Sequence, residues 1–145
     1  MSENPTARSQ EWLDYARADL TAARVLRHAP EVSLAITCFH TQQCAEKALK
    51  AVLVQHEIAF PRTHIIERLL DLLLAAEVKV PARVNEAFVL TQYAVEARYP
   101  GHVDPIALDE ADNALNVAAE VLAWAEAQYI ATHESRDFTR PRGAP

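Results

Sequence analysis

Glycine is nearly absent from this chain of 145 residues, in which only Gly101 and Gly143 occur. Tight β-hairpins need residues that adopt positive φ, and glycine fills most of those positions. Alanine, leucine, glutamate and arginine, which favour helices, are abundant instead. The composition therefore favours an all-helical protein over one built on a sheet.

Cysteine and long apolar runs are also scarce. Cys38 and Cys44 form no CxxC pair, so a zinc or redox motif of that type is excluded, and we expect two reduced, half-buried thiols. No run approaches the ~18 apolar residues of a membrane span. The first twelve residues contain no apolar signal core. We therefore expect a cytoplasmic protein that does not associate with membranes.

Several catalytic signatures are missing. The chain has no GxxxxGK[ST] or GxGxxG phosphate loop, no HExxH or ExxH metal pair and no GxSxG elbow. Its six histidines include no pair at i, i+4. We therefore expect no metal and no cofactor. The formal net charge is −6, so any contact with nucleic acid has to be a local basic site on an acidic body.

Proline residues divide the chain into apolar stretches with helical spacing, because proline lacks an N–H and fixes φ. Five helices are predicted, near residues 9–28, 31–57, 64–77, 81–98 and 105–132. Short connections between them favour an all-α, antiparallel up-and-down bundle of four to five helices. The predicted N-caps of the first, third and last helices are Ser9, Thr63 and Asp104.

Apolar stripes predict which side of each helix is buried. The first segment carries Leu13, Ala16, Leu20 and Ala23 at 3-4-3 spacing. The fourth carries Val84, Phe88, Thr91 and Val95 at 4-3-4 spacing, followed by Arg98. The last has two adjoining stripes, typical of a helix packed against more than one neighbour. They comprise Leu108, Ala111, Leu115, Ala118, Leu122, Ala125 and Tyr129, and Ala114, Val117, Val121 and Trp124.

The organisation is that of one domain. We expect residues 1–8 to be disordered, residues 9–133 to form the helical domain, and residues 134–145 to be a flexible basic tail. The paired apolar arcs of the last helix leave room for a dimer interface beside the monomer core.

Polar residues gather on the second helix. His40, Gln43 and Lys47 point away from its apolar stripe, and Glu46 and Lys50 form an i, i+4 pair on one flank. One interpretation is a solvated face with a single helix ion pair. The other is a binding surface.

Arg98 falls on the apolar stripe of its own helix, where a guanidinium needs an anionic partner. That partner is either an internal carboxylate, such as Glu46 or Glu96, or a phosphate held by two parallel hydrogen bonds. His102 follows in the next loop, and His64 stands at a predicted helix N-terminus. An arginine beside a histidine suffices in principle for RNA cleavage without metal, the imidazole moving the 2′-hydroxyl proton.

The strings FHTQQCAEKALKAVL, FPRTHIIERLLDLL and EARYP, in that order, resemble the HEPN family, the "higher eukaryotes and prokaryotes nucleotide-binding" domain. The resemblance covers about residues 12–129. It implies an antiparallel helical bundle that commonly forms homodimers and pairs with a minimal nucleotidyltransferase, often in toxin–antitoxin or defence systems. In the active branch it implies a metal-independent RNase, whose signature is an arginine, four to six residues, then a histidine, with two copies meeting across the dimer.

This chain has three residues between Arg98 and His102, fewer than that signature. The resemblance thus implies nucleotide or phosphate binding more directly than cleavage. Three functions stay open: a nucleotide- or single-stranded-RNA-binding module, a ribonuclease using Arg98 and His102, and a structural dimerising bundle without ligand. The expected nucleotide- or phosphate-binding residues are Gln43, Glu46, Lys47, Lys50, His64 and Arg98.

Overall fold

A computed structural model describes residues 4–96 and 105–138, and the part of the chain that it describes is helical with no strand. The helices are α1 (Pro5–Leu26), α2 (Leu34–Gln55), α3 (Ile66–Ala75), α4 (Ala82–Asn85), the 3₁₀ helix η1 (Glu86–Gln92), α5 (Tyr93–Glu96) and α6 (Leu108–Phe138). The predicted all-α bundle is confirmed.

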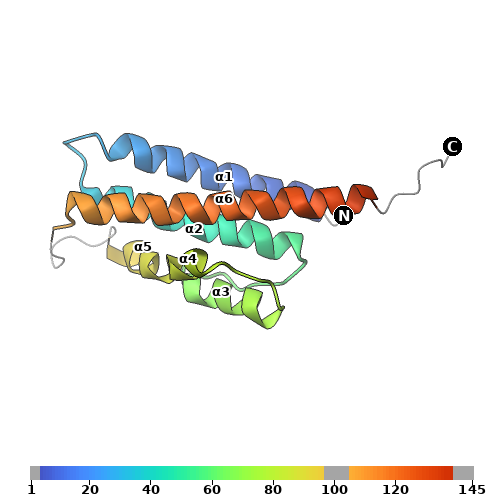
Figure 1. The fold of residues 1–145 in the computed structure, drawn as a ribbon. Coiled ribbons are helices and arrows are strands. Elements are labelled where there is room, and N and C mark those ends of the chain that lie inside the picture. Colours follow the sequence, from blue (N-terminus) through green and yellow to red (C-terminus); the bar gives the residue numbers. More distant parts are fainter. Residues whose placement is uncertain (1–3, 97–104, 139–145) are drawn as a thin grey trace.

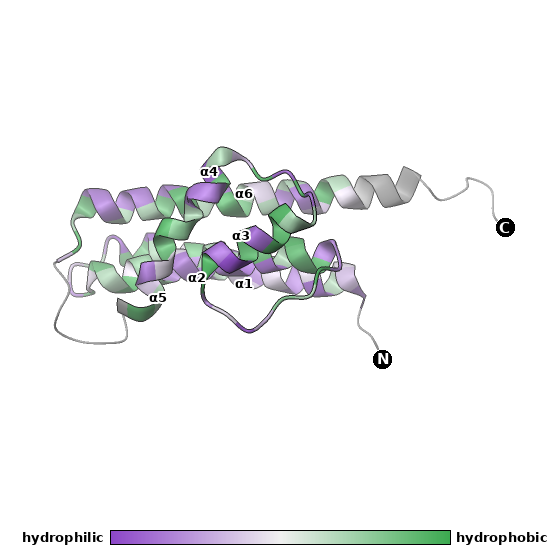
Figure 2. Cartoon of the chain, turned by 90° about the horizontal axis from the view of Figure 1, so that it is seen from below, coloured by the Kyte–Doolittle hydropathy of each residue, from purple (hydrophilic) through white to green (hydrophobic). Residues whose placement is uncertain are grey.

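The three long helices α1, α2 and α6 lie side by side, and the shorter elements cover one side of α2 and α6 (Figure 1). The chain runs one way along α1, back along α2, forward again through α4, η1 and α5, and back along α6 (Figure 1). This is the predicted up-and-down order. Helix α3 is an addition to it, reached from α2 by an extended loop on the outside of the bundle (Figure 2).

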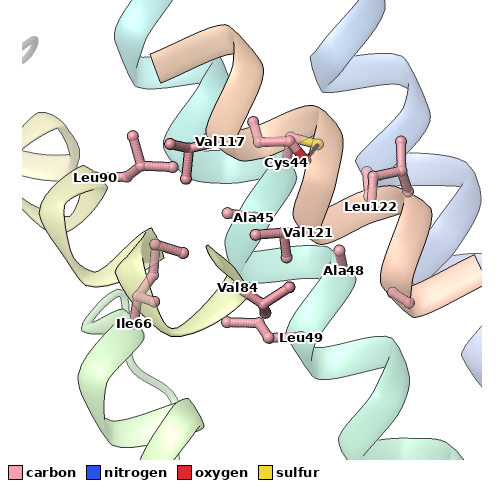
Figure 3. Close-up of a cluster of buried hydrophobic side chains, with 14 of the residues drawn as sticks. Cys44, Ala45, Ala48, Leu49, Ile66, Val84, Leu90, Val117, Val121 and Leu122 are labelled. Atoms are coloured by element: carbon pink, nitrogen blue, oxygen red, sulfur yellow. Dashed lines mark hydrogen bonds between the residues drawn. The ribbon is translucent and has the colours of Figure 1, made fainter. Parts of the chain in front are cut away.

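Helix α2 is the centre of the core, with 15 of its 22 residues buried. Ala45 and Ala48 let α6 approach closely, and Leu49 contacts the layer formed by α3, α4 and η1 (Figure 3). The predicted stripe of α1 is buried. On α6 most of the two predicted stripes is buried, but Leu108 is exposed and Leu115, Trp124 and Tyr129 are half-buried. The two free cysteines are fully buried, and burial raises the pKa of the Cys44 thiol to about 12.

Helix α1 begins at Pro5, earlier than predicted, and Ser9 is not its cap. The side chain of Asn4 accepts from the Thr6 amide at 3.0 Å, and Pro5 occupies the first turn, where its missing N–H is not needed. Ser9 lies inside the helix and its hydroxyl donates to the Ala51 carbonyl at 2.9 Å. The predicted cap is instead a buried link between α1 and α2.

The predicted single helix over 81–98 is wrong, because η1 separates α4 from α5. A 3₁₀ helix has three residues per turn, so side chains at i and i+3 share one face. Val84, Ala87 and Leu90 are accordingly buried at spacings of three. Phe88 and Val95 of the predicted stripe are 50% and 59% exposed.

The starts of α3 and α6 also differ from the prediction. Thr63 does not cap α3; its hydroxyl accepts from the Ile65 amide at 3.0 Å, before the helix begins. The first helical amide, that of Ile66, donates to the Thr91 hydroxyl of η1 at 3.1 Å. Helix α6 begins at Leu108, three residues after Pro105, and ends at Phe138. Asp104, its predicted cap, lies outside the described residues.

Candidate functional site

The carboxylate of Glu46 is the centre of a polar group inside the bundle. Its side chain is 3% exposed. One oxygen, Oε1, lies 2.9 Å from Lys50 Nζ and 3.0 Å from His64 Nδ1. The other, Oε2, accepts from Gln42 Nε2 at 3.3 Å and from Gln43 Nε2 at 3.1 Å. We call Gln42, Gln43, Glu46, Lys50 and His64 the Glu46 cluster.

Lys50 contributes a buried positive charge to this cluster. Its side chain is only 10% exposed, and Nζ lies 5.3 Å from the ring centre of Trp12 and 5.8 Å from that of Phe60. A cation this close to aromatic faces is attracted by their negative charge. The interpretation of Glu46 and Lys50 as a solvated pair is therefore wrong, because α1 and the α2–α3 loop cover that flank.

His64 is the exposed member of the cluster, with 57% of its side chain accessible. The α2–α3 loop places it two residues before α3, and Gln42 Nε2 fixes its backbone by donating to its carbonyl at 3.1 Å. A carboxylate only accepts hydrogen bonds, so Nδ1 carries the proton and donates to Glu46. In the neutral imidazole the lone pair is then on Nε2, which has no partner among the side chains that the structure describes.

Lys47 belongs to a different group on the outer side of α2. Its Nζ lies 2.6 Å from Asp19 Oδ2, and the other Asp19 oxygen lies 2.9 Å from His40 Nδ1. Lys47 also lies 5.7 Å from the ring centre of Tyr15. Gln43, Glu46, Lys50 and His64 of the expected site therefore lie together, whereas Lys47 ties α2 to α1. Arg98 and His102 lie outside the described residues.

A cleft adjoins the cluster at the amino-terminal end of α1. It has a volume of about 810 Å³ and is formed by α1, the end of α2 and the α2–α3 loop. Lys50 is the residue that the cleft shares with the Glu46 cluster. We call it the Trp12 cleft; its charged and aromatic lining comprises Arg8, Trp12, Lys50, Glu57, Phe60 and Arg62.

Sequence reasoning missed this cleft, since its walls come from two segments, residues 5–12 and residues 50–62, that are far apart in the chain. The available signal was local: Phe60, Pro61 and Arg62 form an aromatic and basic stretch in a loop that directly precedes His64. Trp12 and Arg8 share a face of α1 because they are four residues apart.

Two further properties bear on the kind of site. In the described ranges, no three His, Cys, Asp or Glu side chains gather closely enough to hold a metal ion. Over the same ranges, no helix has the length and hydropathy needed to cross a membrane.

The sequence model of the HEPN domain family matches residues 9–128. The chain belongs to the HEPN domain family. The stretch QQCAEK in α2, which carries Gln42, Gln43 and Glu46 of the cluster, lies within one of the three strings that carry the resemblance to HEPN proteins.

Solved structures agree with the assignment to HEPN. The crystal structure of ST0689, an archaeal HEPN homologue, is 30% identical, with a TM-score of 0.68 over 84% of this chain and 98% of that one. TT1696 from Thermus thermophilus is 31% identical, with a TM-score of 0.68 over 83% of this chain and 98% of that one. No curated protein matches the chain.

Proposed function

We propose that this HEPN domain binds nucleotides or single-stranded RNA at the Glu46 cluster. The observation that carries the proposal is the exposed imidazole of His64, fixed by a buried carboxylate beside a buried ammonium group. Lys50 already neutralises Glu46, so a protonated His64 adds a positive charge that the cluster does not balance. Its Nε2–H then donates a charge-assisted hydrogen bond, which suits a phosphate oxygen.

Thermal unfolding tests the binding directly. A ligand that binds only the native state raises Tm in proportion to its occupancy, so AMP, ATP and a single-stranded oligoribonucleotide at millimolar concentration should each be tried. His64→Gln should lose most of the shift. His28→Gln, which changes a histidine after the far end of α1, should keep it. An unchanged Tm with every ligand would reject the binding module.

The second candidate is a metal-independent endoribonuclease, favoured by the pairing of Glu46 with His64. A histidine oriented through Nδ1 by a carboxylate presents Nε2 as a general base, which is the group that removes a 2′-hydroxyl proton. Arg98 and His102 stand in the order of the family's RNase signature and would stabilise the charged phosphorane and move a second proton.

Cleavage of single-stranded RNA in EDTA distinguishes this candidate from binding alone. The ribonuclease should cut in EDTA, and Arg98→Ala, His102→Ala and His64→Ala should each reduce the rate at least about 100-fold. Intact RNA after prolonged incubation with the native protein would reject the enzyme and leave the binding module.

We further propose that the domain forms a homodimer and works with a minimal nucleotidyltransferase, in a toxin–antitoxin or defence pair. Membership in the HEPN family supports this pairing. A reading frame for a small nucleotidyltransferase beside this one, and co-purification of the two products, would bear it out. Sedimentation as a monomer at micromolar concentration would reject the homodimer.

A further inference from the structure

The Trp12 cleft lies beside the Glu46 cluster, and its lining is aromatic and basic. We infer that the cleft is the base-binding part of the site and takes a phosphorylated nucleoside whose base is unpaired. The inference rests on the proposed function, in which the one contact assigned to the ligand is that of its phosphate with His64. It adds the Trp12 cleft as a second contact with the ligand, and it names the class of ligand that fits both the cleft and the Glu46 cluster.

The aromatic wall is the first argument. Trp12 and Phe60 are both half-buried, and both line the cleft. Their ring centres lie 6.3 Å apart with an interplanar angle of 67°, an edge-to-face pair that fixes both rings. Aromatic side chains held rigid at a surface are the platforms on which unpaired bases stack.

The charges of the cleft are the second argument. Arg8 and Arg62 are exposed on its lining and make no ion pair or hydrogen bond with the side chain of any described residue. Lys50 is already neutralised by Glu46, and Glu57 supplies the one other carboxylate. Two unpaired guanidinium groups thus face one carboxylate on a protein whose net charge is −6. Such a local excess of guanidinium attracts phosphate.

The size of the cleft is consistent with this ligand. About 810 Å³ lies within the range of ordinary small-molecule sites. The rings, the arginines and His64 lie on one stretch of surface, since Lys50 and residues 60–64 connect the cleft to the cluster. A base stacked on the accessible part of one of these rings would therefore place its phosphate near the arginines. A free nucleotide and a single-stranded RNA both present this chemistry, whereas a duplex keeps its bases stacked inside.

Tryptophan fluorescence tests the stacking. The chain has two tryptophans, so Trp124→Phe leaves Trp12 as the only reporter. AMP and a single-stranded hexauridylate should quench it on titration, and a matched RNA duplex should not. Adenosine, which lacks the phosphate, and ribose 5-phosphate, which lacks the base, should each bind at least about fivefold more weakly than AMP. Quenching by AMP with no quenching by the hexanucleotide would identify the free nucleotide as the source.

Variants of the cleft make the test specific. Phe60→Leu should weaken AMP about 5- to 100-fold, the range for removing one stacking ring. Arg8→Gln and Arg62→Gln change exposed residues and should weaken AMP without altering Tm. Arg24→Gln is the matched control, since Arg24 is exposed on the same helix sixteen residues further along, about 24 Å away.

The outcomes separate the two proposals. If AMP raises Tm and His64→Gln abolishes the shift, while the cleft variants bind normally and Trp12 is not quenched, the cleft proposal is wrong and the proposed function stands. Equal binding of ribose 5-phosphate and AMP would overturn the base-binding role alone. Failure of AMP and RNA to bind the native protein at all overturns both.

Discussion

Glu46 and Lys50 form an ion pair that is buried in the bundle, with Nζ 2.9 Å from Oε1. In water such a pair, one turn apart on a helix, contributes only a few tenths of a kcal/mol. Here the removal of one partner leaves the other charge buried without its nearest opposite charge, because α1 and the α2–α3 loop cover both side chains. The pair thus makes the stability of the bundle depend on the residues that form the candidate site.

This burial leads to the first prediction. Lys50→Met should lower the free energy of unfolding by about 3–5 kcal/mol, because Glu46 keeps only His64 as a cationic partner. Glu46→Gln should lower it by a similar amount. The double variant should lose clearly less than the sum of the two, as expected for coupled residues. Urea denaturation measures all four proteins; additive losses below about 1 kcal/mol each would show a solvated pair.

A second prediction concerns the Thr91 hydroxyl, which caps the amino-terminal end of α3. It accepts from the Ile66 amide at 3.1 Å and donates to Glu67 at 2.8 Å, so η1 supplies the cap that α3 lacks in its own sequence. Thr91→Val should lower the free energy of unfolding by about 1 kcal/mol, the usual value of an N-cap. Thr91→Ser, which keeps the hydroxyl, is the control. Faster hydrogen exchange at the Ile66 amide in Thr91→Val alone would locate the effect at α3.

A third prediction follows from two ion pairs that join α6 to other helices. Hydrogen bonds from Arg27 hold the pKa of Asp112 below its usual value of 3.8, and hydrogen bonds from Arg83 hold the pKa of Glu120 below 4.5. A depressed carboxylate pKa stabilises the fold above the unfolded-state pKa, and that stabilisation is lost as the pH falls through the folded-state pKa. Acid should therefore remove the contribution of both pairs.

The free energy of unfolding should be measured between about pH 6 and pH 2 for two proteins. One is the wild type, and the other is the double variant that combines Asp112→Asn and Glu120→Gln. The double variant should be less stable at pH 6, and the two curves should converge below about pH 4. Asp71→Asn is the control, since Asp71 makes no ion pair with a described residue and its curve should stay parallel to the wild type. Parallel curves for the double variant would contradict the assignment.

The long helices could be predicted from the sequence because one face of each repeats with helical spacing. Leu13, Ala16, Leu20 and Ala23 of α1 are all buried, as expected. The same rule failed between Val84 and Val95, where it assumes 3.6 residues per turn and the chain adopts three. Thr91 bonds to α3 in this stretch, and a contact 24 residues distant leaves no local pattern.

The candidate site was only half visible in the sequence for a related reason. The spacing of Glu46 and Lys50 predicts that they touch, but whether their flank is buried depends on α1 and the α2–α3 loop. Trp12 and Phe60 meet across 48 residues of chain, so the aromatic wall appears only in three dimensions. The resemblance to HEPN proteins supplied what spacing did not, namely that His64 and the α2 residues belong together.

The fourth prediction uses the two buried cysteines as a probe of the whole bundle. Cys38 and Cys44 are fully buried, and burial raises the pKa of the Cys44 thiol to about 12, so the reactive thiolate is scarce at neutral pH. A thiol reagent such as a disulfide dye at pH 8 should label native protein at least about 1,000-fold more slowly than protein in urea, because labelling waits for opening of the bundle. Both thiols should react in urea.

Lys50→Met, which destabilises the bundle around these thiols, should speed labelling of the native protein, whereas Arg24→Gln should not. Labelling of native wild type at the rate seen in urea would mean that α2 is not held between α1 and α6 as the structure has it.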